Sequence, residues 1–373
     1  MKTRSFLFAP ALIATLLAGA LPSARAETVT DAATSTSAAI GGDDASVAIG
    51  RADSLPTSGA ITDRRPVATY SIVARDPETG QMGVAVQSHW FSVGPIVPWA
   101  EAGVGAVATQ SFVDPTYGPL GLQLMRAGRS APEALRALVS TDADSAVRQV
   151  AMIDAQGRIA AHTGGRCIFA AGHHVGEQYS TEANLMDQPT VWGAMAKAYE
   201  GTEGDLAERL LAALEAAQAE GGDIRGKQSA AIVVVAAEST GKPWVDRIFD
   251  LRVEDDPNPV QELRRLVTLQ RAYLKLNEGD EWVTKDDLDK ALEAYHAATT
   301  LVPDAATNGE AAFWVGITLA DAGRVDEAIP YVQRAYAQDE RWARLVPRLP
   351  DSDLLPKEGG VVERLVQAMT KQQ

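Results

Sequence analysis

The chain has 373 residues, of which 46% are hydrophobic, and its 49 acidic residues outnumber 34 basic ones, which gives a formal net charge of −15. This charge argues against a nucleic-acid binder, because such proteins present a basic surface to the phosphate backbone. The length exceeds that of most single domains, roughly 50 to 250 residues, so we expect more than one domain. The only cysteine, Cys167, excludes intramolecular disulfides and metal sites built from several cysteines.

The first 26 residues have the pattern of a signal peptide. Lys2 and Arg4 precede an apolar run over residues 6–21, and residues 24–26 read Ala-Arg-Ala, a small-x-small cleavage site. An uncleaved anchor is the alternative, but the apolar run is shorter than the roughly 20 residues of a membrane-spanning helix. We therefore predict cleavage of residues 1–26, export to the periplasm or the medium, and no membrane insertion of the mature chain.

Two segments of different character follow. Residues 27–66 are predicted to form a disordered leader, since they contain no aromatic residue and consist largely of small and polar residues. Residues 67–256 alternate short β-rich runs with amphipathic helical runs. Strands are expected at 67–75, 82–88, 103–112, 147–154, 158–163 and 229–237 and through Phe249 and Leu251, with an irregular segment at 164–186. Helices are expected around 117–127, 131–140, 189–200 and 205–219.

This order of elements predicts an α+β fold for residues 67–256. Two antiparallel sheets sandwiched between two helical layers, a four-layer αββα sandwich, would bury the apolar faces of all these elements at once. Ser130 and Glu133 are predicted to form a capping box at the start of the second helix.

Residues 257–373 change to helix-forming residues with a period of 3.6, which predicts a small all-α domain. Within it, residues 309–340 look like a tetratricopeptide repeat, with Gly316 and Ala328 where two helices approach closely and Gly323 in the turn. A degraded second copy precedes this unit. Because the repeats are so few, we expect the array to pack against the first domain.

Several catalytic signatures are missing. The sequence has no G-x-S-x-G elbow, no H-E-x-x-H, no Walker A loop and no dinucleotide fingerprint after a strand. The adjacent His173 and His174 would point to opposite sides of a strand, so we expect a hydrogen-bonding role for them rather than joint metal ligation. The apolar neighbours of Cys167 favour a buried, inert thiol over a nucleophile. No metal and no cofactor are therefore expected.

Five separated motifs carry a resemblance to a known family. They are ATYSIVARDPETGQMGVAVQS, PWAEAGVGAVATQSFVDPTYGPLGL, TGGRCIFAAGHHVG, GGDIRGKQSAAIVVV and DLRVEDDPNPVQELRRL. On these motifs the segment from Thr69 to Leu266 resembles the family catalogued as domain of unknown function 1028. That family is assigned by fold to the N-terminal nucleophile hydrolases, the proteasome-like superfamily, so the resemblance implies the same kind of sandwich.

The resemblance also implies a chemistry. In such hydrolases a Thr, Ser or Cys at the start of the first strand attacks an amide carbonyl, and its own free α-amine serves as the base. The position falls here on Thr69, with Ser71 on the same face of the strand as the runner-up. Signal cleavage would leave Glu27 as the new terminus, so a second cleavage before Thr69 would be required.

The electrostatic support of such a nucleophile is expected to differ from the proteasome pattern. Gln87 or Ser88 occupies the position of the supporting carboxylate, and no lysine occurs between Thr69 and Lys197. We therefore expect the activating network of the proteasome type to be missing. The alternative, in which Thr69 is an ordinary β-branched strand residue, stays open.

Other polar residues fall at predicted strand ends and in loops, where binding sites concentrate. Besides Gln87, Ser88 and His173, the predicted ligand contacts are Thr109, Gln110, Asp114, Tyr117, Asn184, Asp223, Arg225 and Gln228. Some have a structural alternative: Asp114 could form an Asx turn, Tyr117 could fix its loop, and Asp223 with Arg225 could be a loop-fixing ion pair. The glycines of residues 221–228 (GGDIRGKQ) permit close approach of a ligand.

Two functions remain open. The first is a secreted amide or peptide hydrolase of the N-terminal nucleophile type, acting in the cell envelope on a peptide or a peptidoglycan-derived ligand. The second is a catalytically inactive scaffold, whose helical repeats bind a protein partner and whose sandwich is a stable platform. Some members of the resembled family carry a C-terminal region described as peptidoglycan-binding, which here would overlap residues 250–275.

Overall fold

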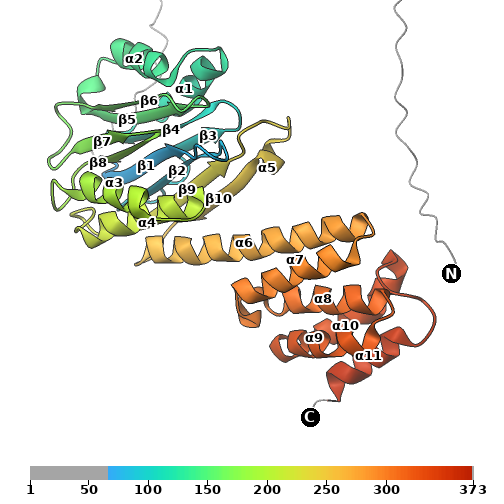
Figure 1. Cartoon of the computed structure of the whole chain (residues 1–373). Coiled ribbons are helices and arrows are strands. Elements are labelled where there is room, and N and C mark those ends of the chain that lie inside the picture. Colours follow the sequence, from blue (N-terminus) through green and yellow to red (C-terminus); the bar gives the residue numbers. More distant parts are fainter. Residues whose placement is uncertain (1–65, 372–373) are drawn as a thin grey trace, which may run out of the picture. The chain divides into compact units, whose positions relative to one another are not determined.

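The computed structural model describes residues 66–371, which form a mixed α+β fold with two antiparallel sheets and a C-terminal helical region (Figure 1). The predicted signal peptide and residues 27–65 of the predicted leader lie outside the described residues. The strands of the six-stranded sheet are, in order, β10 (Arg247–Val253), β9 (Ser229–Val235), β2 (Met82–Ser88), β1 (Thr69–Arg75), β8 (Tyr179–Ala183) and β7 (Gly172–Gly176). Those of the four-stranded sheet are β3 (Pro98–Glu101), β4 (Gly105–Ser111), β5 (Arg148–Asp154) and β6 (Ile159–Thr163).

Each sheet packs against helices on one face and against the other sheet on its second face (Figure 1). The helices on the four-stranded sheet are α1 (Tyr117–Arg126) and α2 (Ala131–Thr141), and those on the six-stranded sheet are α3 (Val191–Gly201) and α4 (Leu206–Ala219). Along β1, Ile72 belongs to the core on the α4 side, whereas Val73 belongs to the core between the sheets. Because side chains alternate along a strand, Thr69 and Ser71 also face the space between the sheets.

Two parts of the sandwich differ from the predicted strand pattern. The segment 164–186, expected to be irregular, contains the hairpin β7–β8, which extends the six-stranded sheet beside β1. The sequence did not predict this hairpin because β8 buries the polar residues Thr181 and Glu182 at positions where most strands bury apolar side chains. β3 escaped prediction because its four residues are too few to show a period.

The chain is already fixed in place before β1 begins. The Val67 N–H donates to the Ser111 carbonyl at 2.7 Å and the Ser111 N–H donates back at 3.1 Å, while Val67 and Ala68 are buried. The Pro66 carbonyl accepts a hydrogen bond from Arg225 Nη1 at 3.1 Å. The leader predicted to run to residue 66 is therefore anchored at its last residue, because a side chain from a distant loop binds it there.

The C-terminal region is helical from residue 259. Its α-helices are α6 (Pro259–Thr284), α7 (Leu288–Leu301), α8 (Glu310–Asp321), α9 (Val325–Gln338), α10 (Trp342–Leu345) and α11 (Val361–Thr370). The remaining short helices are α5 (Pro243–Asp246) and three 3₁₀ turns at Ser145–Val147, Asp304–Thr307 and Val346–Ser352. α6 contributes to two hydrophobic cores, because Val260 and Leu263 pack with α4 and the six-stranded sheet, whereas Leu276 packs with the later helices.

The helix pair α8–α9 depends on small residues at its contact. A Cβ atom added to Gly316 would lie 2.7 Å from Val332 Cγ1 and 3.2 Å from the Ala328 carbonyl oxygen, and Ala328 is itself fully buried. We expect Gly316→Leu or Ala328→Leu to lower the free energy of unfolding by roughly 1 to 3 kcal/mol through overpacking. Urea denaturation of the full chain measures this loss. Parent-like unfolding of both variants would contradict the packing described here.

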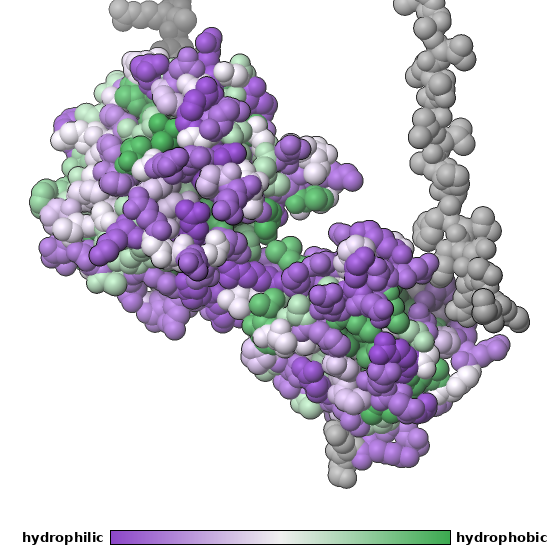
Figure 2. Space-filling view, viewed as in Figure 1, coloured by the Kyte–Doolittle hydropathy of each residue, from purple (hydrophilic) through white to green (hydrophobic). Residues whose placement is uncertain are grey.

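The visible surface of the described residues is mainly hydrophilic, with hydrophobic residues scattered among them (Figure 2). Between residues 66 and 371, no helix combines the length and the apolar character that a membrane crossing requires.

The predicted capping box at the start of α2 is present, since the Ser130 side chain accepts from the Glu133 N–H and the Glu133 carboxylate accepts from the Ser130 N–H.

Candidate active site

Polar side chains gather between the two sheets near the start of β1. Each is at most 1% exposed, and the set comprises Thr69, Ser71, Ser88, Gln110, Gln149, Glu182 and Asn184. Such burial of polar groups is costly unless they are hydrogen-bonded to one another or serve a function. We call this set the inter-sheet cluster.

The Ala68–Thr69 peptide bond lies at one end of the inter-sheet cluster. The Ala68 carbonyl oxygen accepts hydrogen bonds from Ser88 Oγ and, at 3.0 Å, from Arg225 Nη2. Thr69 Oγ1 donates to the Val67 carbonyl at 2.7 Å. Two donors on one carbonyl, one of them cationic, polarise it toward nucleophilic attack in the way an oxyanion hole does.

An ion pair with the buried Asp223 holds the partly exposed Arg225 against this carbonyl. Arg225 Nη2 lies 2.8 Å from Asp223 Oδ2, and the Asp223 side chain is fully buried. Asp223 Oδ2 also accepts from the His89 N–H at 3.0 Å. The loop-fixing ion pair considered from the sequence is therefore present, and it fixes the segment before β1 as well as its own loop.

Gln149 of β5 connects the two sheets. Its Oε1 accepts from Gln110 Nε2 at 2.7 Å and from Asn184 Nδ2 at 2.9 Å, and its Nε2 donates to the Ala183 carbonyl at 2.9 Å. Gln110 and Asn184 also donate to the Thr69 carbonyl, each at 3.4 Å. Sequence reasoning missed Gln149, although a lone glutamine inside the apolar strand 147–154 was a usable signal.

Glu182 places a carboxyl group beside the runner-up nucleophile. Ser71 Oγ donates to Glu182 Oε2 at 3.2 Å, and Glu182 Oε1 has no hydrogen-bond partner within the described chain. Burial raises the pKa of Glu182 to about 8, against a smaller opposing effect of the Ser180 and Ser71 hydroxyls. The carboxyl group is therefore largely protonated at neutral pH. It was missed because it lies in the hairpin that was expected to be irregular.

The remaining predicted residues lie apart from the Ala68–Thr69 bond. Gln87 is opposite Tyr70 in the strand register, hence on the helix-facing side of the sheet, whereas Ser88 is opposite Thr69. Of the two positions considered for a supporting side chain, only Ser88 therefore faces the cluster. Gln228 Nε2 donates to Asp255 Oδ1 at 3.2 Å, outside the cluster.

Thr109, Asp114 and Tyr117 form a separate group near the start of α1. Thr109 Oγ1 donates to the Asp114 carbonyl at 3.0 Å, and Asp114 Oδ1 accepts from the Thr116 N–H at 2.9 Å, which is the predicted Asx turn. The Tyr117 hydroxyl donates to Asp142 at 3.0 Å, and burial together with this carboxylate raises the pKa of Tyr117. These contacts are those of a fixed loop.

His173 lies on the edge strand β7, opposite Glu182 in the register. Its Nδ1 is 2.8 Å from Thr163 Oγ1, in agreement with the expected hydrogen-bonding role, and burial lowers its pKa. Burial raises the pKa of the Cys167 thiol, which disfavours a reactive thiolate. Within residues 66–371, no three His, Cys, Asp or Glu side chains are grouped so that they could hold a metal ion.

The sequence model of a family of unknown function, DUF1028, matches residues 69–263. A crystal structure of a Silicibacter pomeroyi protein that carries the same family designation is 31% identical to this chain. The similarity covers 54% of this chain and 88% of that one, with a TM-score of 0.48. No curated protein matches the chain.

Proposed function

Because the chain belongs to the DUF1028 family, whose function is unknown, we propose an activity from the site itself: an amide or peptide hydrolase of the N-terminal nucleophile type. The nucleophile is Thr69, released by cleavage of the Ala68–Thr69 bond. The observation that carries this proposal is the pair of hydrogen bonds from Ser88 and Arg225 to the Ala68 carbonyl. The two sheets with helices on their outer faces also suit this class, to which a four-layer sandwich belongs.

The cleavage step uses groups already at the bond. Thr69 Oγ attacks the Ala68 carbonyl carbon, and the negative charge develops on the oxygen held by Ser88 and Arg225. The Ala68–Thr69 C–N bond then breaks as its nitrogen takes up the proton that the Thr69 hydroxyl has released, which leaves an ester between Ala68 and Thr69. Water then hydrolyses the resulting ester, which leaves a carboxylate on Ala68 and a free α-amine on Thr69. That amine can serve as the base when the Thr69 hydroxyl attacks the carbonyl of a substrate amide.

In this proposal the protein acts after export, on amide or peptide bonds in the cell envelope. Its substrate is a peptide or a peptidoglycan-derived ligand that reaches Thr69 once residues 66–68 have left. Their departure would open the inter-sheet cluster, because Val67 and Ala68 cover it in the uncleaved chain.

The test is the mature N-terminus of the protein purified from its host. Intact-mass measurement and N-terminal sequencing are expected to find a chain that begins at position 69, with threonine in the parent and serine in Thr69→Ser, and a longer chain for Thr69→Ala. An electrophilic amide mimic such as a β-lactone is expected to label the first two proteins only. Thr109→Ala is the matched control, since this buried strand threonine bonds elsewhere. A parent chain that begins before Thr69 and resists labelling would refute the proposal.

A second candidate function is favoured by the anchoring of residues 66–68. Val67 pairs with Ser111, and the Thr69 hydroxyl is occupied by the Val67 carbonyl. If these contacts persist in the exported protein, the chain is a non-catalytic scaffold. Its helix pairs α6–α7 and α8–α9, which we interpret as tetratricopeptide-like, would then recruit a protein or peptidoglycan-derived partner. The same mass measurement separates the two functions.

A further inference from the structure

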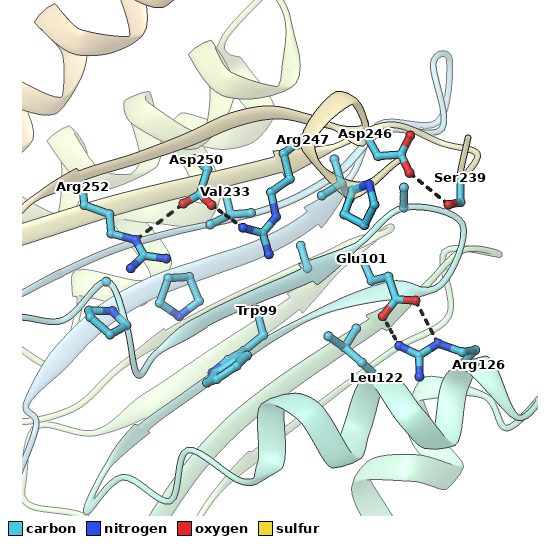
Figure 3. A pocket seen from close by; sticks show the side chains of 17 residues that line it. Trp99, Glu101, Leu122, Arg126, Val233, Ser239, Asp246, Arg247, Asp250 and Arg252 are labelled. Atoms are coloured by element: carbon cyan, nitrogen blue, oxygen red, sulfur yellow. Dashed lines mark hydrogen bonds and ion pairs between the residues drawn. The ribbon is translucent and has the colours of Figure 1, made fainter. Parts of the chain in front are cut away.

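A cavity of about 460 Å³ lies between β3 and β10, at the edge of the two sheets (Figure 3). Its described lining residues come from the segment 94–102, from α1, α5, β9 and β10, and from Ser239 in the loop between β9 and α5, and none of them belongs to the inter-sheet cluster. Its volume falls within the range of small-molecule sites, roughly 300 to 1,000 Å³. The cavity is therefore large enough for a ligand of its own.

The cavity is bounded by apolar groups and by an aromatic side chain. Val233, Val235 and Leu122 line it, together with Trp99, whose indole N–H donates to the Ile96 carbonyl at 3.1 Å. This hydrogen bond fixes the ring in the wall of the cavity. Apolar walls with an aromatic face suit the apolar or aromatic part of an organic ligand.

Two glycines make room for the side chains that line this cavity. A Cβ atom on Gly118 would lie 2.3 Å from Trp99 Cγ, and one on Gly94 would lie 2.8 Å from Arg252 Cδ. The contact at Gly118 leaves no space for a side chain, because the indole ring cannot move away from all three of its close atoms. The indole therefore packs directly on the backbone of α1 and is held in place before any ligand arrives, while Arg252 lies over the backbone at Gly94.

The charged groups of the cavity leave positive charge on one wall. Arg247 Nη1 donates to Asp250 Oδ2 at 2.6 Å, while Arg252 Nε lies 3.5 Å from Asp250 Oδ1, so one carboxylate faces two guanidinium groups. Within the described part of the chain, Arg252 makes no other ion pair. Figure 3 shows both arginines on the β10 side, with Trp99 across the cavity from them. On this wall two guanidinium groups therefore share one carboxylate.

The remaining charged groups of the lining are Glu101, Arg126 and Asp246, and each is held by partners of its own. Arg126 Nε donates to Glu101 Oε1 at 2.8 Å. Asp246 accepts from Thr240 Oγ1 at 2.6 Å and from Ser239 Oγ at 2.9 Å, and these bonds, chiefly those from Thr240, hold the pKa of Asp246 below its usual range. Figure 3 shows its carboxylate pointing toward Ser239, away from Trp99. Arg247 and Arg252 share Asp250, so their guanidinium groups keep N–H donors that a ligand can use.

We propose that this cavity binds a small organic monocarboxylate with an apolar or aromatic body. The carboxylate bonds to Arg247 and Arg252, whose planar guanidinium groups match its two oxygens. The apolar body lies against Trp99 and the valines of β9. Two guanidinium groups that already share the carboxylate of Asp250 suit a monoanion better than a phosphate dianion. The site is independent of cleavage at Thr69.

The test compares two probes that differ only in charge. Isothermal titration calorimetry of the full chain is expected to show saturable one-site binding of N-acetyl-L-phenylalanine, and binding of N-acetyl-L-phenylalaninamide weaker by at least about tenfold. Arg247→Gln and Arg252→Gln are each expected to weaken carboxylate binding by about tenfold or more. Arg265→Gln is the matched control, because Arg265 is an exposed arginine on α6 paired with Glu262, and it is expected to bind like the parent.

Thermal melts confirm that each variant is folded before titration. Arg252→Lys serves as a second variant, which keeps the charge but loses the planar fork, so weaker binding than the parent is expected. The proposal is overturned if the carboxylate shows no saturable binding, if the amide binds equally well, or if the glutamine variants bind like the parent. Tighter binding of inorganic phosphate than of the carboxylate would overturn it as well.

Discussion

Replacing Glu182 with glutamine is expected to remove a large part of the pH dependence of the protein's stability between about pH 4.5 and 8. Burial raises the pKa of Glu182 from its ordinary value of 4.5 to about 8 in the folded protein. The folded state therefore keeps a proton that the unfolded chain releases in this window. The stabilisation is fully present below the unfolded pKa and is lost as the pH rises through the folded one, a change on the order of 4 kcal/mol.

Urea denaturation of the parent and Glu182→Gln at several pH values from 4 to 9 measures this effect. The two proteins are expected to have similar free energies of unfolding near pH 4.5, and the variant is expected to be more stable near pH 8. Glu203→Gln, at an exposed glutamate before α4, is the matched control and should follow the parent profile. Parallel profiles for Glu182→Gln and the parent would show that this carboxyl group does not titrate as described.

Replacing Arg225 with alanine is expected to cost roughly 3 kcal/mol of unfolding free energy, because the buried carboxylate of Asp223 loses its cationic partner and keeps only backbone N–H donors. The variant also loses the hydrogen bonds from Arg225 to the Pro66 and Ala68 carbonyls. Two long-range contacts that hold the entry to β1 therefore disappear together with the ion pair.

A double-mutant cycle measures how much of this cost comes from the unpaired charge. Asp223→Asn combined with Arg225→Ala is expected to lose less than the sum of the two single variants, since no buried charge remains. The control is Arg265→Ala, which removes an exposed ion pair and should cost less than about 1 kcal/mol. A loss for Arg225→Ala no larger than that of the control would mean that the pair does not anchor the segment.

The sequence predicts those elements whose apolar residues repeat with a clear period. β1, β2, β5 and β9 have buried apolar residues, and α1 to α4 lie within a few residues of their expected positions. β7 and β8 lack such a period, because β8 buries Thr181 and Glu182 through hydrogen bonds and register instead. A search for apolar periodicity cannot find a strand whose buried side chains are polar.

The sequence predicted part of the candidate site and missed the residues that only tertiary contacts bring there. The resemblance to a family indicated Thr69, and the choice between Gln87 and Ser88 needed the strand register, which places Ser88 opposite Thr69. Glu182 meets Ser71 of β1 across 111 residues, and Gln149 meets Asn184 across 35, and no local sequence pattern contains such tertiary contacts. The sequence also did not predict that Arg247 and Arg252 line a cavity between β3 and β10. β10 carries a bulge between Arg247 and Phe249, and local periodicity does not reveal it.

Because α6 takes part in two cores, the segment that matches the family is shorter than the segment that packs as one unit with the six-stranded sheet. The family match ends at residue 263, in the second turn of α6, whereas Val267 farther along the same helix still belongs to the core shared with α4 and the sheet. Arg271, another turn on, bonds to Asp205 at the start of α4. A fragment cut at the end of the family match would thus expose apolar surface on the sheet side. The smallest unit that keeps this surface covered therefore ends beyond Val267, where α6 leaves the core shared with the sheet.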